Sequence, residues 1–227
     1  MDIQQIVQLP AREAAPRLLG QIIRRITPAG DIRCRIVETE SYGGAEDKGS
    51  HAYGNRRTNR TEMMFRQGGI SYIYLIYGMY HCLNVVTGPE DDPQAVLIRA
   101  VEPLTSRDEQ LMLLLRNLPP GKLKTLCNGP GKLCRALDID KSLNGIDLLA
   151  SGAQLRLEQA DEQELKKLVI ECGPRINIDY AEEYAAYPWR FYIKDHTYLS
   201  VKNKTPQVFT LPDDEQVCRQ IKNRCTK

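Results

Sequence analysis

The chain is poor in histidine, tryptophan and phenylalanine, and its cysteines are not spaced for metal binding. Among 227 residues there are three histidines, one tryptophan and three phenylalanines, while eleven tyrosines supply most of the aromatic side chains. The seven cysteines include no C-x-x-C pair, and no histidine stands at a spacing that completes a zinc pattern. An odd number of scattered cysteines is typical of reduced structural thiols. We therefore expect no metal site.

Long apolar segments are also missing. Residues 1–5 show no basic segment followed by an apolar one, so no signal peptide is expected. The most apolar stretch, residues 70–86, is interrupted by Tyr77, Gly78, His81 and Asn84, which makes it too short and too polar for a membrane span. The sequence thus predicts a soluble intracellular protein without membrane contact, cytoplasmic in a bacterium or nuclear in a eukaryote.

Neither an internal repeat nor a Pro-, Gly- or Ser-rich linker divides the chain, which is 42% hydrophobic and 26% charged. This composition fits one globular domain with a substantial core. The net charge is only +2, yet residues 48–66 carry five basic side chains against a single acid, Glu62. Such a stretch could contact nucleic-acid phosphates, although a charged run is more often a solvated face.

Hydrophobic periodicity and turn residues predict a mixture of helices and strands. Helices are expected over residues 10–19 and 107–117 and from the segment 129–131 through residue 137. Strands are expected over residues 21–26, 32–38, 70–76, 82–87, 95–101, 154–158 and 189–193. The first two strands form a hairpin, and a polar loop follows over residues 43–58. Because these elements do not alternate as βαβ units, the predicted fold class is α+β.

Two acids and a tyrosine lie at the end of the strand that contains residues 34–37. Glu38, Glu40 and Tyr42 are spaced two residues apart, so they project to the same side of an extended chain. A carboxylate beside an aromatic ring at a strand end can act as a general base next to a flat substrate. The alternative, two solvent-exposed acids on an edge strand, stays open.

Four tyrosines occur within nine residues: Tyr72, Tyr74, Tyr77 and Tyr80. Half-buried packing explains most strand tyrosines, but Tyr77 precedes Gly78 in a predicted turn that would push its ring outward. Exposed rings stack on nucleobases or wedge between base pairs. Together with the nearby arginines, Tyr77 favours a nucleic-acid ligand.

Three further polar residues are candidates for function. His51 lies in the polar loop, where a lone histidine is more often solvated than functional. Asn84 and Arg99 lie on predicted apolar strands, where a polar group needs a partner and a charge is costly unless it is paired. Pairing of Arg99 with a structural carboxylate and a direct functional role are both open.

Several motifs in order along the chain resemble the alkyladenine (3-methyladenine) DNA glycosylases of the human type. The matching segments are RIVETESY at residues 35–42, SHAY at 50–53, YIYLIYGMY at 72–80, CLN at 82–84, VLIRAVEPL at 96–104, NGPGKLC at 128–134 and WRFY at 189–192. The resemblance implies a single compact α+β domain over residues 1–202, with a curved, mainly antiparallel sheet flanked by helices and a protruding β-hairpin. Residues 203–227 would form a C-terminal tail of unclear role.

The same resemblance assigns roles to individual residues. Glu40 would activate a water that attacks C1′, and Arg99 would help to hold that water or the adjacent phosphate. Tyr77 would intercalate into the DNA where the nucleotide has been flipped out. The remaining residues would line the base pocket, with Tyr42 and His51 on one side of the base, Tyr74 on the other, Asn84 rejecting guanine, and further contacts from Leu97 and the backbone carbonyl of Ile176.

The implied activity is monofunctional DNA glycosylase chemistry in base excision repair. Alkylated or deaminated purines (3-methyladenine, 7-methylguanine, hypoxanthine or ethenoadenine) would be flipped out of duplex DNA and released by hydrolysis, leaving an abasic site. No cofactor is implied, and the partner would be double-stranded DNA with damaged purines, bound by a monomer. A non-catalytic module for damaged DNA and a nucleoside or RNA N-glycosidase are the alternatives. Asn177 and Glu182 depart from the family, which has glycines there.

Overall fold

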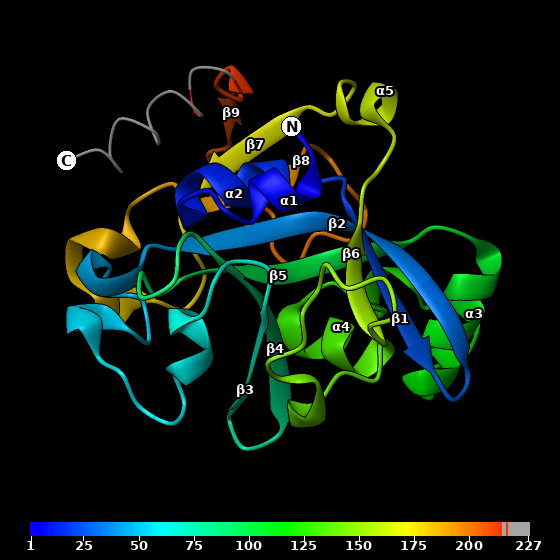
Figure 1. The fold of residues 1–227 in the computed structure, drawn as a ribbon. Coiled ribbons are helices and arrows are strands. Elements are labelled where there is room, and N and C mark those ends of the chain that lie inside the picture. Colours follow the sequence, from blue (N-terminus) through cyan, green and yellow to red (C-terminus); the bar gives the residue numbers. More distant parts are fainter. Residues whose placement is uncertain (215–216, 218–227) are drawn as a thin grey trace.

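One antiparallel sheet organises the residues that the computed structural model describes, 1–214 and 217 (Figure 1). Its strands are β1 (Ile22–Thr27), β2 (Gly30–Tyr42), β3 (Ser71–Ile76), β4 (Tyr80–Thr87), β5 (Gln94–Pro103), β6 (Leu155–Glu158), β7 (Ile170–Gly173), β8 (Arg190–Ile193) and β9 (Gln207–Phe209). The α-helices are α1 (Ile3–Ile6), α2 (Ala11–Arg17), α3 (Ser106–Leu115), α4 (Pro130–Ala136) and α5 (Glu162–Leu165). Short 3₁₀ helices are η1 (Gly44–Glu46), η2 (Tyr53–Asn55), η3 (Glu62–Phe65), η4 (Leu123–Thr125), η5 (Lys141–Leu143) and η6 (Asp179–Ala185). The predicted α+β class is confirmed.

The long strand β2 holds the sheet together. The strand order is β3-β4-β5-β2-β8-β7-β9, while β1 pairs with the first part of β2 and β6 pairs with β1. The prediction ended this strand at residue 38, but β2 continues to Tyr42. The polar side chains of residues 38–41 are all buried, because β5 and β8 flank the strand on both sides. Register shifts in the β2–β5 pairing on either side of Glu38 mark a β-bulge, a device that re-aims side chains.

Helices pack on both sides of this sheet. α2 begins after Pro10, which caps the helix with its fixed φ, and it buries Ala11, Ala14 and Ala15 at helical spacing against β2, β5 and β8. The helix is followed by Gly20, whose φ of +84° is one that glycine adopts without strain. α4 packs on β4 and β5, and the two helices lie above and below β2 in Figure 1.

A small second core supports the loop that carries His51. Met64 and Phe65 of η3 pack with Ala52, Tyr72, Val86 and Ala95, separately from the main hydrophobic core. This cluster fastens the polar loop onto the faces of β3, β4 and β5. The loop is therefore fixed although it has little regular secondary structure.

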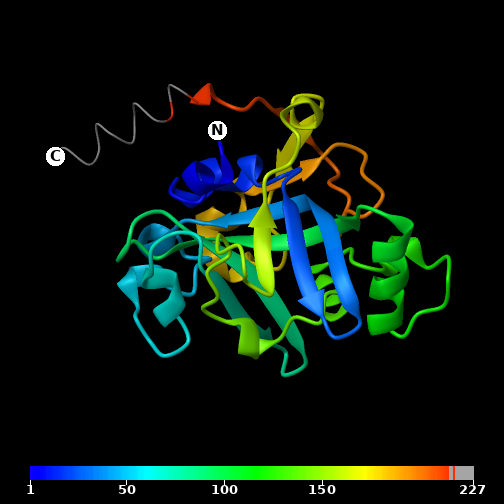
Figure 2. The same cartoon turned by 45° about the vertical axis from the view of Figure 1, so that its right-hand side comes forward.

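The two ends of the described chain meet on one side of the molecule (Figures 1 and 2). The amino group of Met1 and the guanidinium of Arg17 both contact Asp214, and β9 adds to the sheet beside β7. The boundary of a separate tail at residue 203 stays a prediction. Five cysteines are free and buried, whereas Cys218 and Cys225 lie outside the described residues. None of the described helices is long and apolar enough to cross a membrane.

Candidate active site

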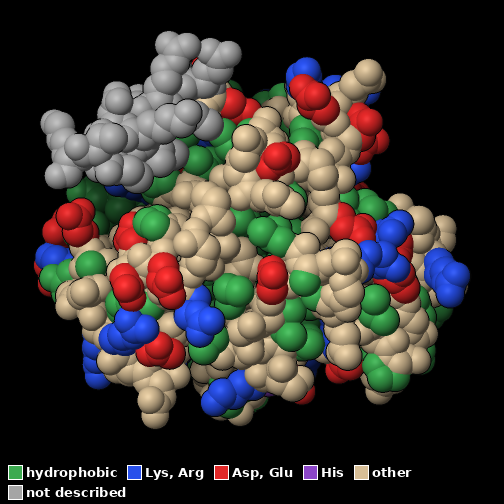
Figure 3. Space-filling view, in the orientation of Figure 1, with side chains coloured by type: hydrophobic (Ala, Val, Ile, Leu, Met, Phe, Trp, Pro, Cys, Tyr) green, Lys and Arg blue, Asp and Glu red, His purple; other side chains and the backbone are tan. Residues whose placement is uncertain are grey.

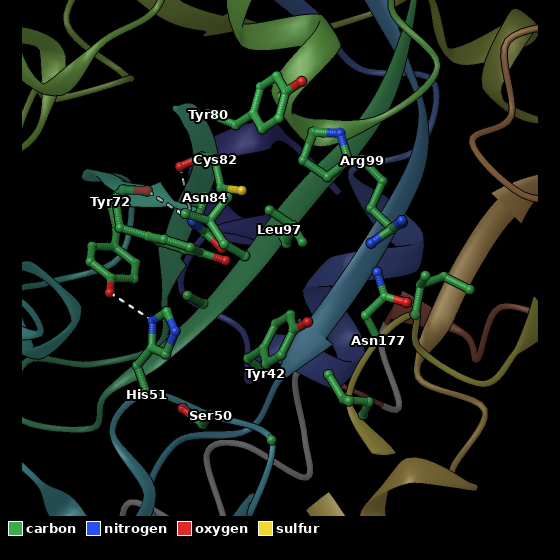
Figure 4. A pocket seen from close by; sticks show the side chains of 18 of the residues that line it. Tyr42, Ser50, His51, Tyr72, Tyr80, Cys82, Asn84, Leu97, Arg99 and Asn177 are labelled. Carbon is green, nitrogen blue, oxygen red and sulfur yellow. Dashed lines mark hydrogen bonds between the residues drawn. The ribbon is translucent and has the colours of Figure 1, made fainter. Parts of the chain in front are cut away.

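A cavity of about 540 Å³ opens between the β3–β4 hairpin, β5 and the loops around residues 50, 130 and 177 (Figure 4). All the sequence-predicted site residues except Glu40 line it: Tyr42, His51, Tyr74, Tyr77, Asn84, Leu97, Arg99 and Ile176. Residues from segments far apart in the sequence are thus brought together. Glu40 lies directly behind this lining and is fully buried.

The carboxylate of Glu40 is surrounded by hydrogen-bond donors. Its Oε2 accepts a hydrogen bond from the Tyr42 hydroxyl at 2.9 Å and lies 3.2 Å from a terminal guanidinium nitrogen of Arg99. Its Oε1 accepts a hydrogen bond from the backbone N–H of Ile176 at 2.7 Å. All three partners donate, so together they hold the carboxylate in one orientation. Burial, and next the charge of Glu40, raise the pKa of Tyr42, so its hydroxyl stays protonated and able to donate.

Arg99 lies between two buried glutamates. Its Nε is 3.2 Å from Glu38 Oε1, and another guanidinium nitrogen is 3.2 Å from Glu40 Oε2. Burial alone would lower the pKa of Arg99, but the charges of Glu40 and Glu38 outweigh it and raise that pKa. The two alternatives for Arg99, structural pairing and a place in the site, therefore coincide in one side chain.

The guanidinium of Arg175 contacts the rings of both Tyr42 and Trp189 and so supports Tyr42. The Arg175 guanidinium lies 4.7 Å from the centre of the Tyr42 ring and 4.9 Å from the Trp189 ring. Asp47 holds Arg175 through two hydrogen bonds of 2.5 and 2.8 Å, and both side chains are buried. No sequence pattern indicates this pair, since 128 positions separate its members.

His51 is neutral in its loop. Burial, and to a smaller extent the charge of Arg60, lower the pKa of His51 to about 4. Its Nδ1 lies 2.9 Å from the Tyr72 hydroxyl, and its ring packs edge-on against Tyr74 with 4.6 Å between centroids (Figure 4). Tyr72 is thus the residue that orients the histidine. The grouping of His51 with Tyr42 on one side of a bound base stays a prediction.

Asn84 and Leu97 face each other on neighbouring strands at the bottom of the cavity. They are directly paired in the β4–β5 register, and Asn84 is almost completely buried. The Asn84 amide donates a hydrogen bond of 3.0 Å to the Tyr72 carbonyl, which fixes its orientation (Figure 4). The polar residue on an apolar strand therefore has a partner, as burial requires.

Tyr77 occupies the tip of the β3–β4 hairpin, and 72% of its surface is exposed. It has a φ of +53°, and Gly78 after it has a φ of +66°. Positive φ at both central turn residues is typical of a type I′ hairpin turn, where asparagine or glycine is usual at the first position. An aromatic residue there is strained, and strained residues cluster at functional sites.

Asn177 and Glu182, which stand where the family has glycine, both have positive φ. Asn177 has a φ of +58°, which asparagine tolerates, as expected from the sequence. Glu182 has a φ of +52° with a ψ of −129°, a conformation that favours glycine. Lys48 contacts the carboxylates of Glu182 and Glu183, which holds this segment against the His51 loop. At Ile176 the backbone N–H, rather than the carbonyl, makes the observed contact with Glu40.

The basic stretch of residues 48–66 is partly neutralised. Arg57 pairs with Glu62 and Asp91, while the Arg60 guanidinium lies 5.1 Å from the Tyr74 ring centre, at the cavity. On the face of the molecule seen in Figure 3, basic and acidic side chains are interspersed. The charge pattern on this face therefore identifies no single binding patch.

Sequence reasoning missed Tyr180 and Lys132, which also line the cavity. Tyr180 is largely exposed and donates a hydrogen bond of 3.3 Å to the Gly49 carbonyl. The Lys132 amino group donates one of 2.9 Å to the Asn128 side chain. The described residues contain no group of three metal-ligating side chains.

Comparison with known proteins gives a consistent result. Residues 5–197 match the family described as methylpurine-DNA glycosylase (MPG). A protein of Natranaerobius thermophilus is 46% identical over 201 residues, which cover 87% of this chain and 97% of the relative. A protein of Bacillus cereus strain G9842 is 47% identical and one of Bacillus thuringiensis is 46% identical, each over 192 residues that cover 84% of this chain and 94% of the relative. All three have the name "Putative 3-methyladenine DNA glycosylase".

Proposed function

The chain belongs to the methylpurine-DNA glycosylase family, a family of DNA glycosylases, and from this premise we propose that it removes damaged purines from duplex DNA. Release occurs by hydrolysis of the N-glycosidic bond and leaves an abasic site. The observation that carries this proposal is the Glu40 carboxylate, held by three donors directly behind an aromatic cavity.

Glu40 is the general base of the proposed reaction. A carboxylate offers about four acceptor sites, and the three donors leave one for a water. As the C1′–N bond breaks, the sugar becomes oxocarbenium-like, and the negative charge behind the cavity stabilises it. Water then forms the C1′–O bond, and its proton passes to Glu40. Arg99 helps to hold this water or the neighbouring phosphate.

The aromatic lining provides the purine pocket. Tyr42 and Tyr74 offer ring faces to a flipped base, and the neutral His51 contributes a hydrogen-bonding edge without a charge. Asn84, paired with Leu97 on the neighbouring strand, is expected to crowd the exocyclic amino group of undamaged guanine. A cationic alkylpurine such as 3-methyladenine or 7-methylguanine leaves readily, whereas hypoxanthine and ethenoadenine need a proton on the departing base.

Tyr77 is the proposed intercalating residue. Its exposed ring at the end of the hairpin can fill the gap that a flipped nucleotide leaves in the stack. A damaged or mispaired base costs less to extrude than a normal one, so the wedge also contributes to selectivity. One domain with one cavity suffices for this chemistry, and we propose that the protein acts as a monomer.

Single-turnover base release tests this function. Duplexes that each carry one 7-methylguanine, hypoxanthine or ethenoadenine are incubated with excess protein, and abasic sites are then cleaved with hot alkali. We expect release from at least one duplex and strand cleavage only after alkali. Tight lesion binding without release would instead identify a binding module, and faster release from free nucleosides would identify a nucleoside N-glycosidase.

Borohydride trapping tests whether the proposed enzyme is monofunctional. Lys132 is the cavity-lining lysine of the described residues, and its amino group is bonded to Asn128. We expect no covalent DNA adduct in the presence of borohydride, because water rather than an amine attacks C1′. An adduct that disappears in Lys132→Met would show that the amine is the nucleophile.

A further inference from the structure

Glu38 is a completely buried carboxylate that the proposed reaction does not use. Arg190 donates a hydrogen bond of 3.0 Å to its Oε1, and Arg99 donates one of 3.2 Å to the same atom. The backbone N–H of Ser200 donates to Oε2 at 2.6 Å, and the Ser200 hydroxyl donates to Oε1 at 2.8 Å. Four donors occupy the about four acceptor sites of this buried carboxylate, so Glu38 is held in one orientation.

The contact of Glu38 with Arg99 determines how that arginine meets Glu40. A guanidinium is planar, so its donors point in fixed relative directions. Glu38 and the Ser200 hydroxyl hold the Nε edge of Arg99, the latter at 3.3 Å. With this edge held, the remaining terminal nitrogen lies 3.2 Å from Glu40 Oε2.

A second connection runs from Glu38 to the other oxygen of Glu40. Arg190, bonded to Glu38, donates a hydrogen bond of 3.0 Å from its Nε to the Pro174 carbonyl. Two residues later, the backbone N–H of Ile176 donates to Glu40 Oε1. Arg190 also lies directly opposite Glu40 in the β2–β8 pairing. Both oxygens of Glu40 therefore have a partner whose position depends on Glu38.

Charge balance gives Glu38 a further effect. Close to Glu40, the charged side chains are Glu38 on the same strand, Arg99 on β5 and Arg190 on β8. Arg175 lies beyond the Tyr42 ring and is paired with Asp47. Tyr42, Tyr74 and Cys82 also face Glu40, and burial raises the pKa of each, so they are neutral. Without Glu38, the cations on β5 and β8 would be balanced by Glu40 alone.

We propose that Glu38, held by Ser200, is a positioning residue that orients Arg99 and shares its charge with Glu40. This inference rests on the proposed role of Glu40 as general base. Ser200 lies beyond residues 5–197, which the family match covers, and neither residue contacts the cavity. Glu38 acts only through its neighbours and does not touch the substrate.

The test compares Glu38→Gln with wild type by single-turnover base release across pH, on the lesion duplex that wild type processes fastest. We expect release about 10- to 100-fold slower at neutral pH, because the isosteric amide no longer holds Arg99 in place. Loss of the Glu38 charge leaves Arg99 and Arg190 less compensated and the site more positive, so the acid limb of the rate profile should move to lower pH. Lesion-DNA affinity should remain within about twofold, since no residue that lines the cavity is substituted.

Asp108→Asn is the matched control. Asp108 is another buried carboxylate, but it accepts hydrogen bonds from Thr105 and the Arg33 backbone at the start of α3. Its substitution should lower stability without moving the acid limb. If Glu38→Gln behaves in the same way, with a limb at the wild-type pH, Glu38 is merely structural and the inference is overturned.

Ser200→Ala keeps the inference testable if Glu38→Gln does not fold. Loss of the hydroxyl removes its hydrogen bonds with Glu38 and Arg99 but no charge, so release should slow about fivefold with the acid limb unmoved. Wild-type rates in this variant would overturn the inference. A wild-type protein that releases no base, or a Glu40→Gln variant that releases it at the wild-type rate, would instead refute the proposed function itself.

Discussion

Replacing Tyr77 with glycine should make the protein more stable and less active on duplex DNA. A non-glycine residue at positive φ is strained by about 1–2 kcal/mol. Glycine relieves this strain, but its greater freedom in the unfolded chain lowers stability by about 0.5–1 kcal/mol. Since 72% of the tyrosine is exposed, few contacts are lost. The net gain of about 0.5–1 kcal/mol corresponds to a rise in Tm of about 1–4 °C for a chain of this size.

The same substitution removes the proposed wedge. Base–aromatic stacking contributes about 1–3 kcal/mol, so release from duplex should slow about 5- to 150-fold. Release from single-stranded substrate should slow much less, because no stack has to be held open. The assay combines thermal denaturation with single-turnover release from matched duplex and single-stranded lesion oligonucleotides.

Asn117→Gly provides the control for Tyr77→Gly, because Asn117 also has positive φ but lies outside the cavity lining, just after α3. It should change stability by less, as asparagine tolerates this conformation, and it should leave both release rates unchanged. A lower Tm for Tyr77→Gly would refute the strain argument. Equal slowing on duplex and single strands would refute the wedge.

Three further predictions concern stability around the site. Glu182→Gly should raise the free energy of unfolding by about 1 kcal/mol in thermal denaturation, because strain is relieved while Lys48 keeps its second carboxylate partner; a decrease would contradict this. Asp47→Asn should lower it by about 3 kcal/mol in urea, since Arg175 keeps its charge without a counterion; a loss below about 1 kcal/mol would show that the pair is dispensable. The folded pKa of about 4 for His51 lies below its ordinary value of 6.5, so the unfolded chain binds more protons between these pH values. The free energy of unfolding should therefore fall as the pH is lowered from 6.5 to 4, by at most about 1.4 kcal/mol per pH unit. His51→Gln should make that decline shallower, and an unchanged slope would assign it to other groups.

The sequence predicted much of the fold where local patterns and burial agree. The helix before Gly20 and the β3–β4 hairpin were predicted, because a proline at the start and a glycine past the end of a helix, and two strand-like runs around a short turn, are local signals. The end of β2 was predicted wrongly, because buried polar residues on a central strand look like a loop in the sequence. β7 and β9 were not predicted.

Long-range pairing explains what was missed in the candidate site. The motifs identified Glu40, Tyr42, His51 and Arg99, but not the residues that hold them. Asp47 meets Arg175 across 128 positions, and Glu38 meets Ser200 across 162. Nothing in the local sequence of an aspartate in a polar loop or of a serine after β8 indicates which buried charge it will contact.

The most direct test of the central claim is single-turnover base release by Glu40→Gln beside wild type, on whichever lesion duplex wild type processes fastest. Glutamine keeps the shape, but its single oxygen can accept the hydrogen bond of either Tyr42 or Ile176 and not both, and it cannot take a proton from water. Binding of the lesion duplex, measured in parallel, controls for folding and cavity shape. We predict unchanged binding and release at least about 100-fold slower, the lower range for loss of a general base. Release at the wild-type rate by a variant that binds normally would contradict the account.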